Sequence, residues 1–222
     1  MPEHNQYAGV PGQDDLACAA SLLSQGRVIA FPTETWYGLA VDPLNEQALA
    51  RLFAVKKRPA DKPVLVLVAH RDQLDRLVSS IPPLYHGLMQ RFWPGPLTLV
   101  FPARDELPDQ LTAGTGTIAV RFSPHPLACA LIDRFGGPVT ATSANISGQP
   151  ACATAADVHD VFGTKLDMVL DGGTTPGGKG STIVCCLQGQ LVCLRNGQID
   201  FASVLAEAAL GWDADSQHHR AG

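Results

Sequence analysis

The polar and apolar positions of the chain follow two patterns that alternate along it. In the first, apolar residues recur every three or four positions, as Leu16, Ala20 and Leu23 do, and this spacing predicts an amphipathic helix. Asp14 precedes the run as a capping residue, and Gly26 ends it. The same signals predict further helices at 45–55, at 71–78, from 82 to 92, from 124 through 131, from 154 and from 200.

The second pattern consists of short apolar runs bounded by polar, glycine or proline residues, which is typical of buried strands. Strands are predicted at 27–31, 64–69, 97–101, 117–122, 139–141, 168–170, 182–186 and 191–194. The four residues 187–190, between the last two strands, suit a hairpin, which joins antiparallel strands. Since helices interleave with the other strands, we expect an α/β fold with a mixed sheet and helices packed on it.

The length and composition fit one globular domain. The 222 residues are 45% hydrophobic and 17% charged, which excludes disorder over the whole chain. We expect a single domain over 13–210, with flexible termini at 1–12 and 213–222. The net charge of -5 argues against general electrostatic affinity for nucleic acid, although it is compatible with a local basic groove.

The sequence contains no targeting or membrane signal that we recognise. Residues 1–12 lack a basic region followed by an apolar core, and no apolar run reaches the ~18 residues of a membrane span. The six cysteines form no CxxC pair, and three lie in apolar strand-like runs, so buried thiols are expected rather than disulfides or a zinc site. We expect a cytoplasmic protein without membrane association.

A cluster of cations follows the second predicted helix. Lys56, Lys57 and Arg58 lie at its end, and Lys62 follows in a proline-restricted segment before the strand at 64–69. Cations at a helix C-terminus commonly do no more than complement the helix dipole. At the entrance to a buried strand, they are also well placed to meet an anionic ligand over a sheet.

Small polar side chains follow the short strand at 139–141. Ser143 and Asn145 carry hydroxyl and amide donors that can converge on phosphate oxygens. A solvated turn has the same composition, so this segment is weak evidence by itself.

The glycine-rich segment 171–182 resembles a phosphate-binding P-loop only in part. It contains GxxxxGK, but Gly180 stands where that motif requires Ser or Thr. It also leads into a strand, whereas a P-loop leads into the helix that holds the phosphate. We therefore reject a P-loop and expect a mobile loop that delivers Ser181 and Thr182 to a site, with 172–180 as a candidate lid.

Arg121 and Arg195 each end an apolar strand. An arginine can grip a carboxylate or a phosphate through two parallel hydrogen bonds, although an arginine at a strand end can equally reach into solvent. Other catalytic classes lack their signatures, because there is no HExxH or Cys/His ligand spacing, no GxSxG elbow and no GxGxxG that opens a helix. We expect no metal site built by the protein itself.

Several blocks of sequence between about Ala17 and Gly197 occur in a specific order and spacing. They are Phe31-Pro32-Thr33-Glu34-Thr35-Trp36-Tyr37-Gly38-Leu39, Lys56-Lys57-Arg58-Pro59, Trp93-Pro94-Gly95-Pro96-Leu97-Thr98, Ala119-Val120-Arg121, Ser143-Ala144-Asn145, Ser181-Thr182-Ile183-Val184 and Leu194-Arg195. Together they resemble the YrdC-like family, whose enzymes are threonylcarbamoyl-AMP synthases. The KxR and SxN signatures of that family are present as Lys56/Arg58 and Ser143/Asn145.

The resemblance implies a twisted, open α/β fold with a concave, positively charged cavity. It implies that ATP, with Mg²⁺ as its expected counter-ion, is bound by Lys56, Arg58, Lys62, Thr117, Ser143, Asn145 and Arg195. L-threonine would contact Thr33, Arg121 and Ser181. Catalysis would depend on Lys56, Arg58, Ser143 and Asn145.

The chain departs from the family in three places. Lys62 stands where many relatives have asparagine, so we expect a nucleotide contact there to differ in character. Leu67 stands where some relatives place a histidine near the threonine, so that contact is not expected. The chain stops soon after Arg195 and therefore resembles the short, single-domain form of the family.

The implied reaction joins L-threonine, bicarbonate and ATP into threonylcarbamoyl-AMP and pyrophosphate, for N6-threonylcarbamoyladenosine modification of tRNA. The attacking carbamate is already an anion, so no Ser or Cys nucleophile is needed, whereas positive charge and in-line placement are. A downstream threonylcarbamoyl transferase complex is the expected partner, and direct binding of tRNA stays open.

Two other interpretations stay open. A YrdC-like fold can present a basic groove to double-stranded RNA or tRNA as a non-catalytic binding module, although this leaves Thr33 and Arg121 without a role. A paralogue that uses a different carbamoyl substrate is the second, because the choice of substrate is not legible from the sequence.

Overall fold

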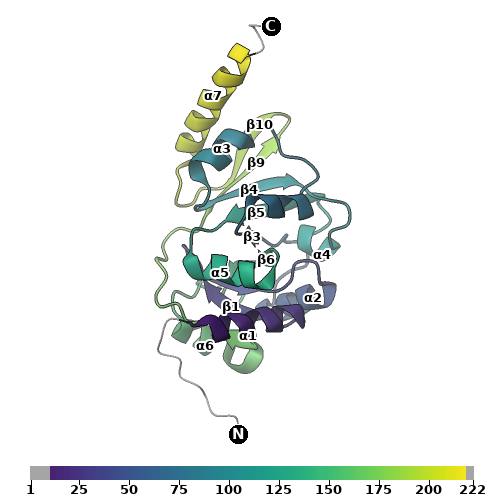
Figure 1. Ribbon diagram of the computed structural model, residues 1–222, viewed down its shortest axis with the longest axis vertical. Helices are drawn as coiled ribbons and strands as arrows, with labels where there is room; N and C mark the ends of the chain where they lie inside the picture. The colour runs from purple at the N-terminus through teal and green to yellow at the C-terminus, as the bar shows by residue number, and fades with distance from the viewer. Residues whose placement is uncertain (1–10, 219–222) are drawn as a thin grey trace.

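The computed structural model describes residues 11–218, in which helices pack around two β-sheets (Figure 1). The helices are α1 (Gln13–Ser24), α2 (Glu46–Lys56), α3 (Tyr85–Phe92), α4 (Asp109–Thr112), α5 (Pro126–Phe135), α6 (Ala155–Phe162) and α7 (Phe201–His218), with short 3-10 helices η1 (Arg71–Arg76) and η2 (Gly163–Lys165). Of the termini predicted to be flexible, 1–10 and 219–222 lie outside the described residues, and flexibility there stays a prediction.

The strands within 11–218 form a four-stranded and a six-stranded sheet. The first sheet has the order β7 (Thr142–Ser143), β2 (Tyr37–Ala40), β1 (Ile29–Pro32), β8 (Met168–Val169). The second has the order β10 (Gln190–Arg195), β9 (Thr182–Leu187), β4 (Leu97–Pro102), β5 (Thr117–Phe122), β3 (Val66–Val68), β6 (Val139–Thr140).

Both sheets combine parallel and antiparallel pairs. In the smaller sheet, β1 runs antiparallel to β2 and parallel to β8. In the larger sheet, β4 runs antiparallel to β5 and parallel to β9, and β9 and β10 form the antiparallel hairpin that the sequence predicts. The predicted mixed α/β class is therefore confirmed, with the strands divided between two sheets.

Strand β2 is one of the elements that the sequence reading missed, together with β7 and α4. All four of its residues are buried, but the run is short and shows no alternation of polar and apolar positions that would mark it as a strand. Through its pairing with β7, it brings Gly38 opposite Ser143. This pairing connects the turn after β1 to the segment that carries Ser143 and Asn145.

The ends of two helices show how local sequence sets their bounds. Asn45 caps α2 as predicted, because its Oδ1 accepts a hydrogen bond from the Ala48 N–H at 3.1 Å. The prediction that Asp14 caps α1 is wrong, because α1 already begins at Gln13. There the N–H of Gly12 donates to the Asp15 carboxylate at 2.9 Å.

Two apolar clusters hold the layers together. One lies around the six-stranded sheet and includes Tyr85, Leu88 and Phe101. The other lies where α1 and α5 run side by side against β1, and it includes Leu23 and Leu131 (Figure 1). Within the described residues, no helix has the length and hydropathy needed to cross a membrane.

Candidate active site

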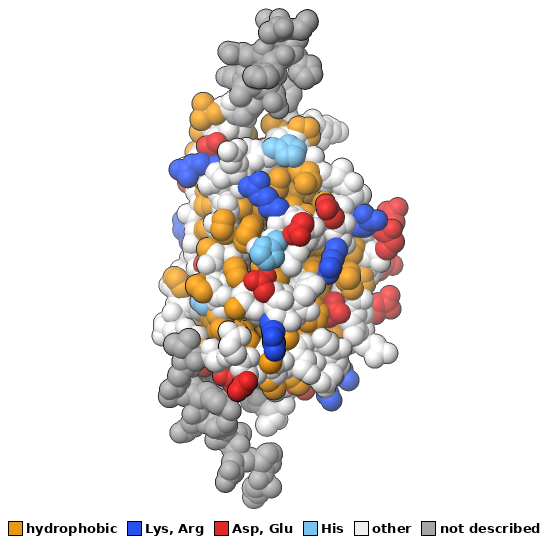
Figure 2. Space-filling view, viewed as in Figure 1, with side chains coloured by type: hydrophobic (Ala, Val, Ile, Leu, Met, Phe, Trp, Pro, Cys, Tyr) orange, Lys and Arg blue, Asp and Glu red, His pale blue; other side chains and the backbone are white. Residues whose placement is uncertain are grey.

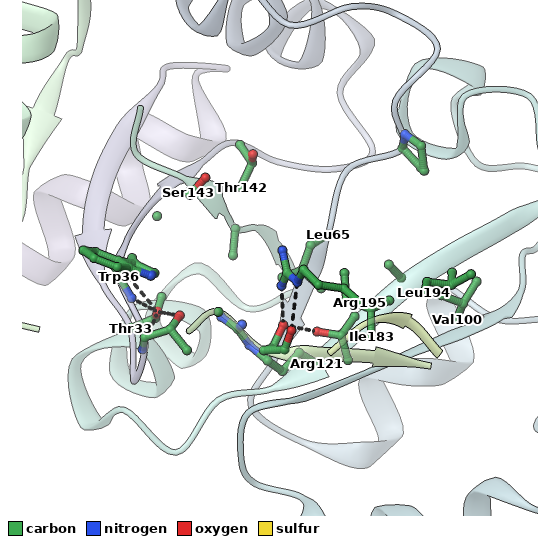
Figure 3. A pocket seen from close by; sticks show the side chains of 18 of the residues that line it. Thr33, Trp36, Leu65, Val100, Arg121, Thr142, Ser143, Ile183, Leu194 and Arg195 are labelled. Atoms are coloured by element: carbon green, nitrogen blue, oxygen red, sulfur yellow. Dashed lines mark hydrogen bonds between the residues drawn. The ribbon is translucent and has the colours of Figure 1, made fainter. Parts of the chain in front are cut away.

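A cavity of about 300 Å³ lies between the two sheets (Figure 3). Its wall on the side of the smaller sheet consists of Thr33, Thr35, Trp36, Tyr37, Gly38, Thr142 and Ser143. The larger sheet contributes Thr98, Val100, Ala119, Arg121, Ile183, Leu194 and Arg195. Segments outside the strands complete the lining with Arg58, Pro63, Leu65, Ala141, Gly180 and Ser181. A volume of this size is at the lower end of the range for small-molecule sites.

The structure brings six of the predicted site residues to this one cavity. They are Thr33, Arg58, Arg121, Ser143, Ser181 and Arg195. The other four, which are Lys56, Lys62, Thr117 and Asn145, are not among the lining residues. Six predicted site residues that are far apart in the sequence therefore meet at one cavity. The other four lie outside its wall.

Three guanidinium groups face the cavity. Arg58 is fixed by its neighbours, since its Nε donates to the Lys62 carbonyl at 3.2 Å and its Nη2 to the Pro63 carbonyl at 2.7 Å. Burial lowers the pKa of Arg58, Arg121 and Arg195, and the charge of Arg195 also lowers the pKa of Arg121. Positive charges that are desolvated and close to one another favour an anionic ligand between them.

Arg195 and Ser181 form a connected pair in the cavity wall. Arg195 donates from Nε to the Ser181 carbonyl and from Nη2 to the Ser181 Oγ, both at 2.9 Å (Figure 3). The Ser181 Oγ also lies 2.8 Å from the Oγ1 of Thr98. Arg195 occupies one lone pair of this oxygen, and either hydroxyl can be the donor in the contact between Ser181 and Thr98.

Thr33 shapes the turn between β1 and β2. Its buried Oγ1 donates to the Trp36 carbonyl at 2.7 Å and accepts from the Thr35 N–H at 3.2 Å. A hydroxyl that closes a turn in this way fixes the backbone around it. The turn is thus a rigid wall of the cavity, with the Trp36 side chain at its edge (Figure 3).

Lys56 lies beneath the Ser143–Asn145 segment. Only 1% of it is exposed, and its ammonium donates to the Ser143 carbonyl, to the Asn145 carbonyl at 2.9 Å and to the Asn145 Oδ1 at 3.1 Å. Asn145 Oδ1 also accepts from the Ser143 Oγ at 2.6 Å. The lysine therefore holds the segment that presents Ser143 to the cavity, and all three of its donors are occupied within the protein.

Replacing Lys56 with methionine should change how stability depends on pH. Burial, and then the charge of Arg58, lower the pKa of Lys56 from 10.5 to about 7. Between these two values the unfolded chain binds more protons than the folded protein, so the lysine makes stability rise with pH by roughly 1.4 kcal/mol per unit. Lys56→Met lacks this contribution. Denaturant unfolding of both proteins at several pH values across this window measures the difference, and equal slopes would contradict it.

Lys62 and Thr117 lie outside the cavity wall. The Lys62 side chain is exposed, and its backbone carbonyl accepts the hydrogen bond from Arg58. Thr117 begins β5, and its Oγ1 lies 2.8 Å from the Oγ1 of Thr115. Their predicted contacts with ATP stay predictions.

Tyr37 ties the glycine-rich segment to the cavity, a role that the sequence reading missed. Its buried O–H donates to the Gly173 carbonyl at 2.8 Å and accepts from the Gly172 N–H at 3.2 Å. Burial raises the pKa of Tyr37 to about 12, which keeps the phenol protonated as a donor. Further along, the Gly177 N–H donates to the Thr35 carbonyl at 2.8 Å. These contacts anchor the segment at Gly172, Gly173 and Gly177, and its movement as a lid stays a prediction.

Gly197 supports the cavity wall from behind. A Cβ at this position would overlap the backbone of Gly180, Ser181 and Thr182. Gly197→Ala should therefore displace Ser181, and a displacement of about 1 Å typically lowers activity about 100-fold. Gly87 in α3 is the matched control, because a Cβ there meets nothing within 4 Å. Gly87→Ala should leave activity unchanged and add roughly 0.5–1 kcal/mol of stability. Equal activities of the two variants would contradict this role of Gly197.

No group of three or more His, Cys, Asp or Glu side chains within the described part of the chain is placed to hold a metal ion. The lining residues offer instead cationic and hydroxyl donors. Such a set suits a ligand that carries carboxylate or phosphate oxygens.

The chain is similar to known proteins of one family. Residues 21–197 match the model of the Sua5–YciO–YrdC family, which is described as "Telomere recombination". The chain is 41% identical over 186 residues to threonylcarbamoyl-AMP synthase of Pyrococcus abyssi and 42% identical over 198 residues to that of Bacillus subtilis. The crystal structure of Pyrococcus abyssi Sua5 complexed with L-threonine matches with a TM-score of 0.85 and 39% identity.

The coverage of these matches is uneven. The match to the Pyrococcus abyssi synthase covers 84% of this chain and 55% of the relative, and the match to the Bacillus subtilis synthase covers 88% and 56%. The match to the crystal structure covers 88% of this chain and 58% of that chain. The chain thus spans little more than half the length of these three relatives.

Proposed function

The chain belongs to the Sua5–YciO–YrdC family, and from this premise we propose that it forms threonylcarbamoyl-AMP and pyrophosphate from L-threonine, bicarbonate and ATP. The observation that carries the proposal is the convergence of Arg58, Arg121 and Arg195 on one cavity. Two substrates that both carry negative charge repel each other, and a set of fixed cations offsets this repulsion.

Threonine binds in this account at the end of the cavity formed by Thr33, Arg121 and Ser181. The carboxylate lies against the guanidinium of Arg121, which suits a bidentate contact. The Ser181 hydroxyl group is a polar partner for the rest of the amino acid, and Thr33, whose hydroxyl closes the turn, contacts it as part of the cavity wall. This placement leaves the amine free to react.

The amine adds to carbon dioxide derived from bicarbonate, and a carbamate forms with loss of one proton. A carbamate oxygen then attacks the α-phosphorus of ATP, the bond to the bridging oxygen breaks, and pyrophosphate leaves with the electron pair. Arg58, Arg195 and Ser143 supply charge and hydrogen bonds around the phosphates, and Lys56 and Asn145 hold Ser143 in place. Removing one preorganised donor of this kind typically costs about 3 kcal/mol of transition-state stabilisation.

Mg²⁺ would accompany ATP as the counter-ion of its phosphates. The product would pass to a threonylcarbamoyl transferase complex in the cytoplasm, where tRNA receives the group. Lys62 and Thr117 are proposed as outer contacts of ATP.

The alternative of a non-catalytic RNA-binding module is less well supported. The arginines named above converge on one cavity, together with hydroxyl side chains. On the face seen in Figure 2, basic and acidic side chains are interspersed and do not gather into a basic patch. A binding surface for double-stranded RNA relies on a continuous basic area.

Release of pyrophosphate from ATP separates the two functions. The proposed enzyme releases pyrophosphate only when threonine and bicarbonate are both present. Omission of either one gives the background rate. A binding module releases none under any of these conditions, and that result would refute the proposal.

A further inference from the structure

The turn that carries Thr33 also places a carboxylate behind the cavity. Glu34 follows Thr33 at the tip of the β1–β2 turn, and its side chain is 12% exposed. It is not among the residues that line the cavity. The hydrogen bonds of the Thr33 hydroxyl with Trp36 and Thr35 span Glu34, so they fix the backbone from which this side chain extends.

The Glu34 carboxylate contacts the guanidinium group of Arg121 at its Nε. Its Oε1 lies 3.0 Å from that nitrogen, but the two atoms are not aligned for a hydrogen bond, so the contact is an ion pair. The other carboxylate oxygen, Oε2, accepts a hydrogen bond from the buried Ser123 Oγ at 2.5 Å. The backbone of Glu34 is therefore held in the β1–β2 turn, and its carboxylate is held by Ser123, which follows β5.

The remaining nitrogens of Arg121 are left for a ligand. The arginine is 3% exposed and lines the cavity, and neither Nη donates a hydrogen bond to any residue within 11–218. The guanidinium group is planar, so a charge that fixes its Nε edge also sets the direction of its two Nη groups. Two parallel donors are the geometry that a carboxylate accepts.

We propose that Glu34 is a positioning residue, which orients Arg121 so that both Nη groups face the carboxylate of the amino-acid substrate. The inference rests on the proposed function, since it concerns the same threonine subsite. Glu34 does not touch the substrate and acts only through Arg121. Its effect is therefore specific for ligands that carry a carboxylate.

The ion pair also has a less specific interpretation, in which Glu34 merely neutralises the charge of Arg121. The two roles predict opposite changes in the affinity for threonine when the charge of Glu34 is removed. A neutralising carboxylate weakens the attraction of Arg121 for a second carboxylate, so its removal would tighten threonine binding. A positioning carboxylate strengthens binding, so its removal weakens it.

Glu34→Gln is the sharpest variant, because it keeps the shape of the side chain and removes the charge. Binding of L-threonine and of L-threonine amide, which lacks the negative charge, is measured by titration calorimetry on the full chain. We expect the affinity for threonine to fall about 10-fold, since misplacement of a positioning contact has effects of this order or larger. The affinity for the amide should change less than about twofold, and Glu34→Asp should recover part of the loss.

Glu106→Gln is the matched control, because Glu106 is exposed and pairs only with Arg104. It should bind both ligands as the parent protein does. If Glu34→Gln does not fold, Ser123→Ala removes the hydroxyl that holds Oε2 and should weaken threonine binding in the same direction. Unchanged or tighter binding of threonine, or an equal loss for both ligands, would overturn the inference. A parent protein that neither binds threonine nor releases pyrophosphate would instead overturn the proposed function, and the inference with it.

Discussion

Arg121→Ala is expected to raise the KM for threonine about 100-fold or more while the KM for ATP changes little. Arg121 lines the cavity with two terminal nitrogens that have no partner within 11–218. Loss of two hydrogen bonds to a charged group costs about 3 kcal/mol or more, which corresponds to at least about 100-fold in affinity. Steady-state rates of pyrophosphate release, with each substrate varied in turn, measure both constants.

The controls for Arg121→Ala separate loss of binding from loss of fold. Removal of the arginine leaves the Glu34 carboxylate unpaired in a buried place, which typically destabilises a protein by about 3–5 kcal/mol. Arg121→Lys keeps the charge beside Glu34 but lacks the planar fork, so it should fold normally and bind threonine with intermediate affinity. Arg134→Ala, at an exposed position of α5, should behave as the parent protein does. A threonine KM of Arg121→Ala within twofold of the parent would refute the assignment.

Arg195→Ala is expected to lower kcat about 100- to 1,000-fold, the range for loss of one preorganised donor at a developing charge. It should also raise the KM for threonine, which distinguishes it from a variant that only weakens ATP binding. The reason is that Arg195 holds the carbonyl and the hydroxyl of Ser181, and Ser181 belongs to the proposed threonine subsite. The same rate measurements with ATP and threonine varied separately test both effects.

Ser181→Ala serves as the comparison for Arg195→Ala. It removes the shared hydroxyl but keeps the contact between Arg195 Nε and the backbone carbonyl. It should therefore raise the threonine KM with a smaller loss in kcat. An Arg195→Ala variant that keeps a kcat close to that of the parent would contradict the role of this arginine.

The arginines are the part of the site that the sequence predicts most directly. Arg121 and Arg195 end strands that the apolar runs identify, and strands of one sheet bring their ends together. Their chemistry follows from the side chain itself, since an arginine near a cavity favours oxygen anions. Local sequence was therefore sufficient to select them as candidates.

The hydrogen bonds of Lys56 are a part of the site that local sequence does not predict. Its position at the end of α2 and its charge predict a contact with phosphate, but its ammonium is occupied by the Ser143–Asn145 segment. That contact joins positions 87 and 89 residues apart, so only the packed fold reveals it. The sequence identifies the residue and its partners Ser143 and Asn145, but it does not show that the lysine bonds to them.

Glu34 and Tyr37 were missed for a related reason. Both lie in the block around Thr33, but their partners Arg121, Ser123 and Gly173 are far away in the chain. Strand β2, which places Tyr37, is too short to show a periodic pattern. Side chains that act by holding another residue leave no local signal of their own.

The measurement that tests the account most directly is a mass spectrum of the reaction product. The protein is incubated with ATP, Mg²⁺, threonine and bicarbonate labelled with heavy carbon, and the small molecules are separated from it at once. The account predicts a threonylcarbamoyl adenylate that carries the label and forms far more slowly when Arg121 or Arg195 is replaced by alanine. If ATP and threonine are recovered unchanged, or if only an unlabelled adenylate forms, the cavity does not join these substrates and the central claim is wrong.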